Sequence, residues 1–258
     1  MSDLPNNKTR KNNSRKRRDT PEGLWVKCTE CSEIIYNGEL IRNIRICHKC
    51  GYYFPLEPQE RLDLLADDNS LKILNTEGKD FNLEKGVENW AIMTADAKLS
   101  GHRLIISILN LNFTNHDISL FLCKNLIDAI NKAVIEELPL LIVYNNGAAL
   151  QSKNNVLFPS QSLSINAALS HLLEKDLLYI SLLAHSDSHD CFPGFAYLAD
   201  IVVLESKVGD NIRSTNRFNQ KNYILRPDHP LVENGMVDIL ISREESKKQI
   251  TKILDFFC

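Results

Sequence analysis

The chain has 258 residues, of which 43% are hydrophobic and 24% are charged, and its formal net charge is −3. These proportions are typical of a globular protein and exclude a collagen-like fibre and a wholly disordered chain. No stretch approaches the roughly 18–20 consecutive apolar residues that would cross a bilayer, so no membrane-spanning segment is expected. The length allows one large domain or two smaller ones.

Residues 1–23 form a polar tail with seven Lys or Arg residues and three Asp or Glu residues. Its net charge of +4 leaves −7 for the remainder of the chain. A basic segment without apolar periodicity is predicted to be disordered. It could contact the phosphates of a nucleic acid, dock on an acidic partner, or be a solvated leader without a ligand.

The next segment, residues 24–57, is predicted to be a small zinc ribbon. Cys28 and Cys31 form one CxxC pair, and Cys47 and Cys50 form a second pair after an interval of fifteen residues. Two such pairs can hold four thiolates about 2.3 Å from one Zn²⁺, and four Cys ligands leave no coordination position open for catalysis. One structural Zn²⁺ per chain is therefore predicted. Disulfide pairing is the alternative, and it requires an oxidising compartment.

The interval between the two pairs favours a β-hairpin. Residues 33–36 and 40–46 are strand candidates, and Asn37-Gly38 between them is typical turn sequence. Gly51 follows the second pair and supplies the backbone freedom that a turn beside the metal requires.

Residues 58–95 are predicted to be a helical linker, with an amphipathic helix over 58–67 followed by a polar, weakly periodic segment. From residue 96 to residue 258, apolar strands alternate with amphipathic helices, which predicts an α/β domain with buried, mostly parallel strands. The expected strands are 104–109, 140–144, 177–184, 201–205 and 237–241, and the expected helices are 123–137, 160–175, 195–198 and 243–257.

Three further motifs stand in order along the chain. Gly-Leu-Trp-Val-Lys-Cys at 23–28 leads into the CxxC pairs, Glu-Arg-Leu-Asp-Leu-Leu follows at 60–65, and Leu-Val-Glu-Asn-Gly-Met-Val-Asp stands at 231–238. Together they resemble the carboxyltransferase beta subunit of bacterial and plastid acetyl-CoA carboxylase. Many families share the zinc motif, so the ordered later matches carry the resemblance. It implies that residues 96–258 adopt the crotonase-like fold, a superhelix of stacked ββα units.

The resemblance also implies an activity and partners. Such a subunit transfers a carboxyl group from carboxybiotin to acetyl-CoA, giving malonyl-CoA for fatty acid synthesis. The implied partners are the carboxyltransferase alpha subunit and the biotin carboxyl carrier protein, in a hetero-oligomer of two alpha and two beta subunits. The implied compartment is the plastid stroma or the bacterial cytoplasm.

That chemistry develops negative charge on an enolate oxygen and on the ureido oxygen of biotin. Paired backbone N–H groups in glycine-rich loops meet such charges best. This chain has lost most of those glycines: residues 145–151 read Asn-Asn-Gly-Ala-Ala-Leu-Gln, and residues 114–119 and 187–190 contain none. Gly147 and Ala148 are the predicted amide donors for substrate, and no catalytic side chain is assigned.

Three functions are therefore compatible with the sequence. The first is a carboxyltransferase beta subunit with eroded glycine-rich loops. The second is a catalytically inactive beta-like subunit with a structural role in a complex. The third is a zinc-ribbon protein that binds nucleic acid through the basic tail, against which the acidity of the remaining chain counts.

Overall fold

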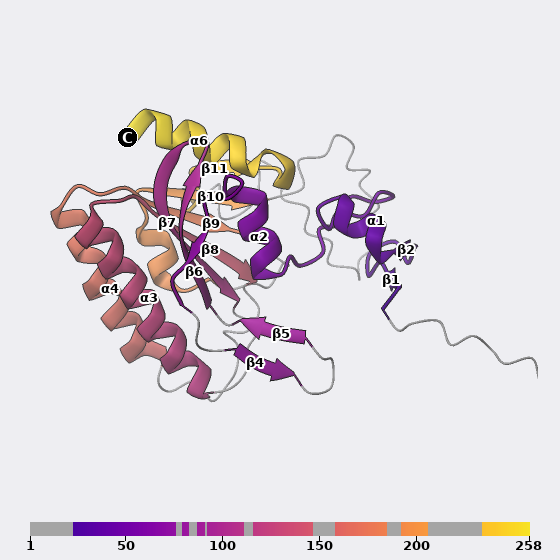
Figure 1. The fold of residues 1–258 in the computed structure, drawn as a ribbon, viewed down its shortest axis with the longest axis horizontal. Helices are drawn as coiled ribbons and strands as arrows, with labels where there is room; N and C mark the ends of the chain where they lie inside the picture. Colours follow the sequence, from indigo (N-terminus) through magenta and orange to yellow (C-terminus); the bar gives the residue numbers. More distant parts are fainter. Residues whose placement is uncertain are drawn as a thin grey trace, which may run out of the picture.

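The computed structural model describes residues 23–75, 79–82, 87–90, 92–110, 116–146, 158–184, 192–205 and 234–258. Within these residues, a small N-terminal module lies at one side of a larger α/β body (Figure 1). The predicted tail, except Gly23, lies outside the described residues. No helix in this part of the chain is long and apolar enough to cross a membrane.

The N-terminal module contains two short strands and a helix: β1 (Trp25–Lys27), β2 (Ile34–Tyr36) and α1 (Asn37–Arg42). The predicted hairpin over residues 33–46 is wrong, because β2 pairs with β1 upstream and not with a strand downstream. The second strand candidate is instead α1 and the turns that follow it. The helix places Leu40 in the small core of the module together with Ile35.

The segment predicted as a helical linker starts with the expected helix, α2 (Pro58–Leu65). Proline occupies the first helical position, and the Glu57 N–H donates to the Glu60 carboxylate at 2.9 Å, so the helix start is well defined. The segment continues in β3 (Lys72–Ile73) and an antiparallel pair, β4 (Lys79–Asn82) and β5 (Val87–Trp90). Strand β6 (Ile92–Leu99) crosses the predicted boundary at residue 95. The division of the chain into domains at these residues stays a prediction.

The body is built on a seven-stranded sheet in the order β11–β10–β9–β8–β7–β6–β3. Its remaining strands are β7 (His102–Asn110), β8 (Leu140–Asn146), β9 (Tyr179–Leu183), β10 (Ile201–Glu205) and β11 (Ile239–Ile241). Strands β7 to β11 are parallel, as predicted, whereas β6 and β3 run antiparallel at one edge. All five predicted strands are present, and β6 and β3 are additions to the sheet.

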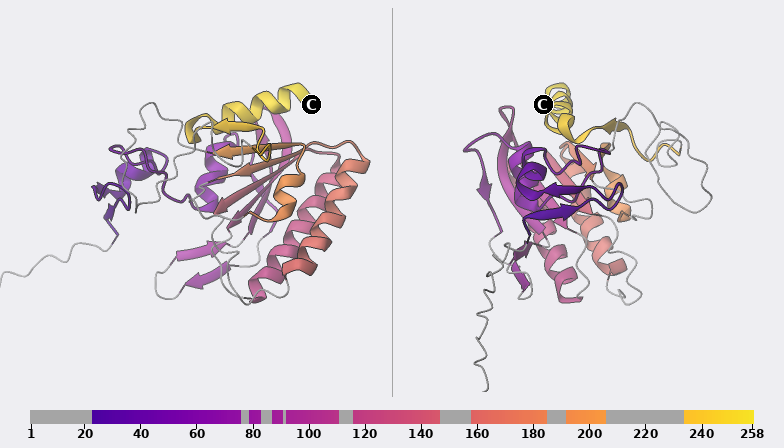
Figure 2. Two further views of the ribbon diagram at one scale, coloured as in Figure 1. Left: turned by 180° about the vertical axis from the view of Figure 1, so that it is seen from behind. Right: turned by 90° about the vertical axis from the view of Figure 1, so that its right-hand side faces the viewer.

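Helices cover both faces of this sheet (Figure 2). Besides α2, the helices are α3 (His116–Glu136), α4 (Phe158–Glu174) and α6 (Ser246–Phe257), with short 3₁₀ helices at Gly194–Leu198 and Arg243–Glu245. Along β8, Leu140, Ile142 and Tyr144 belong to the core formed with α3 and α4, whereas Leu141 and Val143 belong to the core formed with α2 and α6. The continuous apolar run predicted as a buried strand is therefore apolar because both of its faces are buried.

The parallel strands place their carboxyl ends along one edge of the sheet, called the carboxyl edge below. The segments that follow β7, β8, β9 and β10 begin at this edge, and they lie outside the described residues. In open parallel sheets, ligands bind beyond the carboxyl ends of the strands. The last residues of β8 and β10 are therefore the described residues expected to lie nearest to a substrate site.

Candidate functional site

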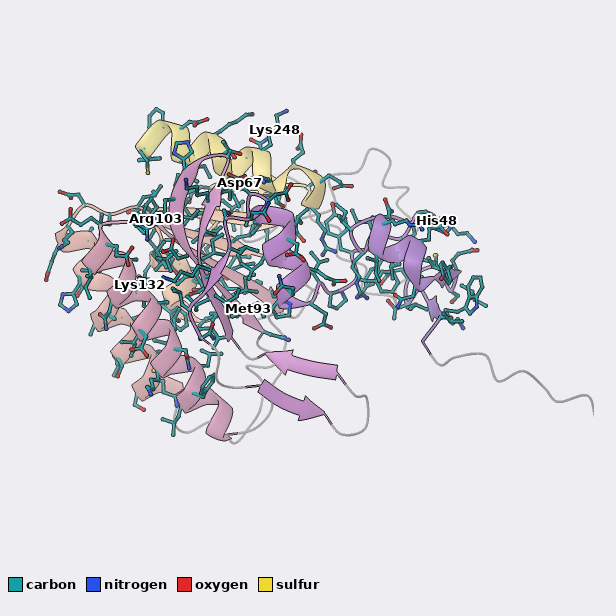
Figure 3. All side chains as sticks on the ribbon, viewed as in Figure 1. His48, Asp67, Met93, Arg103, Lys132 and Lys248 are labelled. Atoms are coloured by element: carbon teal, nitrogen blue, oxygen red, sulfur yellow. The ribbon has the colours of Figure 1, made fainter. Side chains whose placement is uncertain are left out.

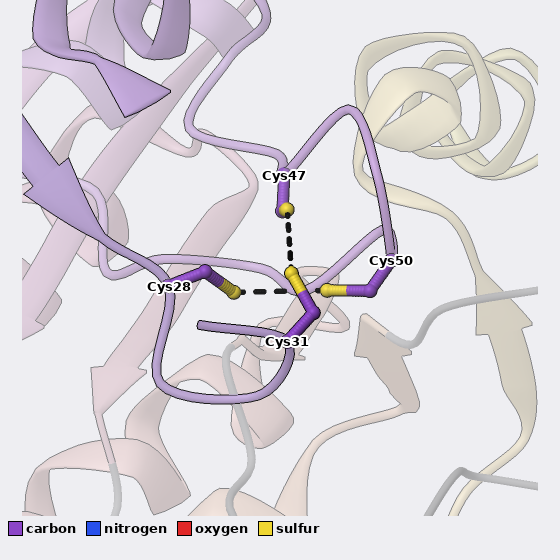
Figure 4. Close-up of side chains that lie close together, drawn as sticks. All are labelled: Cys28, Cys31, Cys47 and Cys50. Atoms are coloured by element: carbon purple, nitrogen blue, oxygen red, sulfur yellow. Dashed lines mark hydrogen bonds between the residues drawn. The ribbon is translucent and has the colours of Figure 1, made fainter. Parts of the chain in front are cut away.

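The four predicted metal ligands meet in the N-terminal module (Figure 4). Their sulfur atoms all lie within 4.8 Å of one another, and Cys28 Sγ lies 3.6 Å from Cys50 Sγ. The separation between Cys31 Sγ and Cys47 Sγ is 3.7 Å. A tetrahedron with Zn–S arms of about 2.3 Å has sulfur–sulfur edges of about 3.8 Å, so the arrangement matches a tetrahedral thiolate site.

Two equivalent turns position these ligands. The Cys28 N–H donates to the Glu33 carbonyl at 2.8 Å, and the Ser32 N–H donates to the Cys28 carbonyl at 3.0 Å. The same pair of bonds recurs in the second turn, from Cys47 to Tyr52 and from Gly51 to Cys47, both at 2.8 Å. Each CxxC pair thus forms the same local turn, and for this reason the spacing of the cysteines was sufficient to predict the metal site.

Burial and hydrogen bonding act differently on the cysteine thiols of the module. Burial raises the pKa of the Cys28 and Cys50 thiols. At Cys47 burial acts in the same direction. The N–H groups of Cys50 and Lys49, together with hydrogen bonds from the Cys50 and Cys31 thiols, outweigh burial and lower the pKa of Cys47 to about 7. A lowered thiol pKa favours the thiolate, which is the form of cysteine that binds metals.

A structural Zn²⁺ fits this donor set. The sulfur separations are far longer than the roughly 2.05 Å of a disulfide, and all four cysteines are free, so the alternative of disulfide pairing finds no support. His48 lies inside the second CxxC pair, but its side chain is half exposed and its Nδ1 lies 3.9 Å from Glu39 Oε1 (Figure 3). It is not among the ligands.

A group of fully buried polar side chains lies where the module meets the carboxyl edge. Arg61 on α2, Glu205 at the end of β10 and Arg243 after β11 each expose 2% of their surface or less. Arg61 binds both carboxylate oxygens of Glu205, and Arg243 Nε donates to Glu205 Oε1 at 2.8 Å. Sequence reasoning missed this group, which we call the arginine–glutamate cluster.

Charge pairing keeps the cluster ionised. Burial by itself would keep the Glu205 carboxyl neutral, but the two neighbouring guanidinium groups outweigh it and hold the pKa of Glu205 well below its usual range. Arg243 also stacks on Tyr53, with the guanidinium carbon 4.5 Å from the ring centroid.

The cluster joins the module to the sheet. Arg243 Nη1 donates to the carbonyls of Phe54, at 2.8 Å, and Ile44, at 3.2 Å. A second contact of the module is a forked pair between Arg45 and Glu60 on α2, with N–O distances of 2.8 to 3.0 Å. The module is thus fastened to the same edge of the sheet at which ligands are expected.

The predicted substrate-binding residues, Gly147 and Ala148, lie outside the described residues. Strand β8 ends at Asn146, directly before them. Asn145 is buried, its amide group donates to the Leu56 carbonyl, and its Oδ1 accepts a hydrogen bond from Arg61 Nε at 3.4 Å. The assignment of Gly147 and Ala148 as amide donors stays a prediction. Asn145, two residues before Gly147, is held by its hydrogen bonds with Leu56 and Arg61.

Comparison with protein families and with individual sequences gives consistent matches. The family model described as the acetyl-CoA carboxylase zinc finger domain matches residues 25–50. An acetyl-coenzyme A carboxylase carboxyl transferase subunit beta from Desulforamulus reducens is 30% identical over 96% of this chain and 92% of its own length. The protein of the same name from Prochlorococcus marinus strain AS9601 is 27% identical over 92% of this chain and 88% of its own length.

Solved structures establish the fold. The beta subunit of Pseudomonas aeruginosa geranyl-CoA carboxylase superposes with a TM-score of 0.54 at 16% identity, covering 78% of this chain and 42% of that one. The Pseudomonas malonate decarboxylase hetero-dimer gives a TM-score of 0.50 at 18% identity, covering 78% of this chain and 86% of that one. These are crotonase-fold proteins, so the predicted crotonase-like fold behind a zinc ribbon is confirmed.

Proposed function

Because the chain belongs to the family of the acetyl-coenzyme A carboxylase carboxyl transferase beta subunits, we propose that it is an active half of a carboxyltransferase that moves a carboxyl group from carboxybiotin to acetyl-CoA. The observation that carries this proposal is the extent of the match. It covers 96% of the chain, and therefore includes both the four-cysteine module and the sheet. A protein that had kept only a nucleic-acid-binding zinc ribbon would match over the ribbon alone.

The proposed chemistry needs stabilisation of two developing oxyanions. Gly147 and Ala148 follow β8 at the carboxyl edge of the sheet, where the fold class binds ligands, and their N–H groups are the proposed donors to the acetyl-CoA enolate. The zinc would be held by Cys28, Cys31, Cys47 and Cys50 and would fix the ribbon, without an open position for substrate.

We propose the carboxyltransferase alpha subunit and the biotin carboxyl carrier protein as partners, with two alpha and two beta subunits in the assembly. The compartment, bacterial cytoplasm or plastid stroma, stays a prediction. The scarcity of glycine in residues 145–151 favours one second candidate, a beta-like subunit that assembles but does not turn over.

Reconstitution with the cognate alpha subunit separates these candidates. The assay is carboxylation of free biotin that depends on malonyl-CoA, the reverse of the proposed reaction. We expect a stable complex with turnover. A stable complex without turnover would identify the inactive subunit, and absence of a complex would direct attention to the tail and to salt-dependent binding of nucleic acid.

One pair of variants tests the proposed donors in the active complex. Gly147→Val keeps the backbone N–H, but its branched side chain should block the close approach of substrate to that N–H. We therefore expect kcat/KM to fall on the order of 10²–10³-fold, the usual effect of losing one oxyanion donor. Gly194→Ala is the matched control, because Gly194 is exposed and no atom lies within 4 Å of the added methyl group. Equal activity of the two variants would remove Gly147 from the proposed site.

A further inference from the structure

The arginine–glutamate cluster has one carboxylate at its centre and two cations at its sides. Glu205 Oε1 accepts hydrogen bonds from Arg243 Nε at 2.8 Å and from Arg61 Nη2 at 3.1 Å. The Ser246 hydroxyl lies 3.4 Å from Oε2. All of these side chains are buried.

The bonds of the cluster close into a ring that begins and ends in the ribbon. From the Phe54 carbonyl the ring runs through Arg243 to Glu205, and from Glu205 to Arg61. Arg61 continues to Asn145, whose amide group returns to the ribbon at the Leu56 carbonyl. One carboxylate therefore links the ribbon, the end of β10 and the end of β8.

Stability alone does not explain such a ring. Buried ion pairs are costly to desolvate, and well-packed apolar residues of similar volume often stabilise a core equally well. Hydrogen bonds differ from apolar contacts because they fix directions and distances. The group that the ring orients is Asn145, two residues before Gly147.

We propose that Arg61, Glu205 and Arg243 are positioning residues that fix the zinc ribbon and the end of β8 relative to each other, and so set the course of the chain into the acyl-CoA half-site. This inference rests on the proposed function for its last step only. All three side chains are buried, and each acts through Asn145 or through the ribbon.

Hydrogen exchange measured by mass spectrometry on the zinc-loaded full chain tests the positioning step directly. The variant Glu205→Gln keeps the size of the side chain but places an amide donor against two guanidinium groups. We expect exchange to accelerate at least about tenfold in two peptides together, one covering residues 44–56 and one covering residues 144–146. Acceleration in only one of them would overturn the proposal.

The control is a second ion pair in the same sheet. Its carboxylate lies on β6, which is separated from β10 by β7, β8 and β9. Asp96 on β6 is buried and binds Arg103 with N–O distances of 2.6 and 3.0 Å, and it lies opposite Ile105, which pairs with the first residue of β8. Asp96→Asn should lower stability without accelerating exchange in either peptide. Equal acceleration in this control would show a general loss of stability and would also overturn the proposal.

If Glu205→Gln fails to fold, the triple variant Arg61→Met, Glu205→Leu and Arg243→Met takes its place. It keeps the packing of the three side chains but removes their hydrogen bonds, including the one from Arg61 to Asn145. Apolar replacement should keep the melting temperature near that of the wild type, whereas both peptides should still exchange faster. Wild-type protection in this variant would show that the polar ring is unnecessary.

Turnover gives the second readout. In the complex with the alpha subunit, Glu205→Gln should raise KM for malonyl-CoA at least about tenfold relative to Asp96→Asn, at a temperature where both are folded. If the wild-type complex has no turnover, the proposed function fails, yet the exchange experiment still decides whether the cluster positions the end of β8.

Discussion

Ser32 and Gly51 occupy equivalent positions, each directly after the second cysteine of a CxxC pair. Their φ values are 60° and 67°, in the left-handed region that favours glycine. A non-glycine residue there costs about 1 kcal/mol. Gly51 therefore suits its backbone conformation, whereas Ser32 adopts a strained one.

Adding a glycine at position 32 and removing the glycine at position 51 should change the stability of the ribbon in opposite directions. Ser32→Gly should raise the free energy of unfolding of the zinc-loaded ribbon by about 0.5–1 kcal/mol, and Gly51→Ala should lower it by about 1 kcal/mol. Competition with a zinc chelator measures both changes. A shift of the same sign in both variants would mean that φ does not decide stability at these turns.

Removal of one ligand should release the metal. We expect zinc content to fall from one ion per chain to nearly none in Cys47→Ser, because the remaining three thiolates lose a tetrahedral corner. Metal analysis after gel filtration gives the measurement. Cys258→Ser is the control, since Cys258 is exposed and lies outside the group of four. One zinc per chain in Cys47→Ser would refute the assignment.

The cysteine site could be predicted from the sequence, whereas the arginine–glutamate cluster could not. The cysteines of each CxxC pair are three positions apart, so their chemistry is local and could be predicted. Glu205 lies 144 positions from Arg61 and 38 positions from Arg243, and each of the three is an ordinary charged residue in its local segment. Only the folded chain reveals that they meet.

At the scale of elements, strands buried on both faces were predicted well because their sequences are continuously apolar. Strand β6 was missed, although all of its residues but Lys98 are buried. It contains Thr94 and Asp96, which are satisfied by Ser107 and Arg103 on the neighbouring strand, and this pairing cannot be read from the β6 sequence alone. The hairpin in the ribbon failed for a related reason, since a strand's partner is chosen by tertiary packing.

Asp67 lies just beyond the last residue of α2, and its carboxylate joins this helix to other elements. The Asp67 carboxylate lies 2.9 Å from Lys247 Nζ on α6 and accepts hydrogen bonds from the N–H groups of Ser100 and Gly101 in the turn between β6 and β7. The hydrogen bond from Lys247, with the two backbone N–H groups, lowers the pKa of Asp67 from 3.8 to about 2 despite partial burial.

A lowered carboxyl pKa stabilises the folded state above the unfolded pKa and loses that effect as the pH falls through the folded value. Asp67→Asn should therefore be less stable than the wild type by about 1 kcal/mol at pH 7, allowing for solvent screening. The difference should shrink between about pH 4 and pH 2, as measured by urea unfolding. Asp68→Asn, at an exposed neighbouring position, is the control. A difference that stays constant with pH would contradict the role of the Asp67 charge.

At the scale of the whole molecule, the three hydrophobic clusters are very unequal. Two large clusters cover the two faces of the sheet, whereas the ribbon has only Cys28, Ile35, Leu40, Cys47 and Phe54 as the buried residues of its cluster. A core of this size cannot stabilise a fold without a metal. The ribbon should therefore depend on zinc, and the sheet should not.

Calorimetry with and without a zinc chelator tests this difference. Chelation should unfold the ribbon and leave one main transition from the α/β body. That transition should move down by about 2–10 °C, because Arg243 loses its ribbon acceptors and is left with Glu205 alone. In Arg243→Met the ribbon carbonyls already lack this donor, so chelation should shift the main transition less than in the wild type, by the loss of the Asn145–Leu56 and Arg45–Glu60 contacts alone. If chelation shifts this transition equally in the wild type and the variant, the ribbon stabilises the body through contacts other than Arg243, of which the Arg45–Glu60 pair is the first to remove.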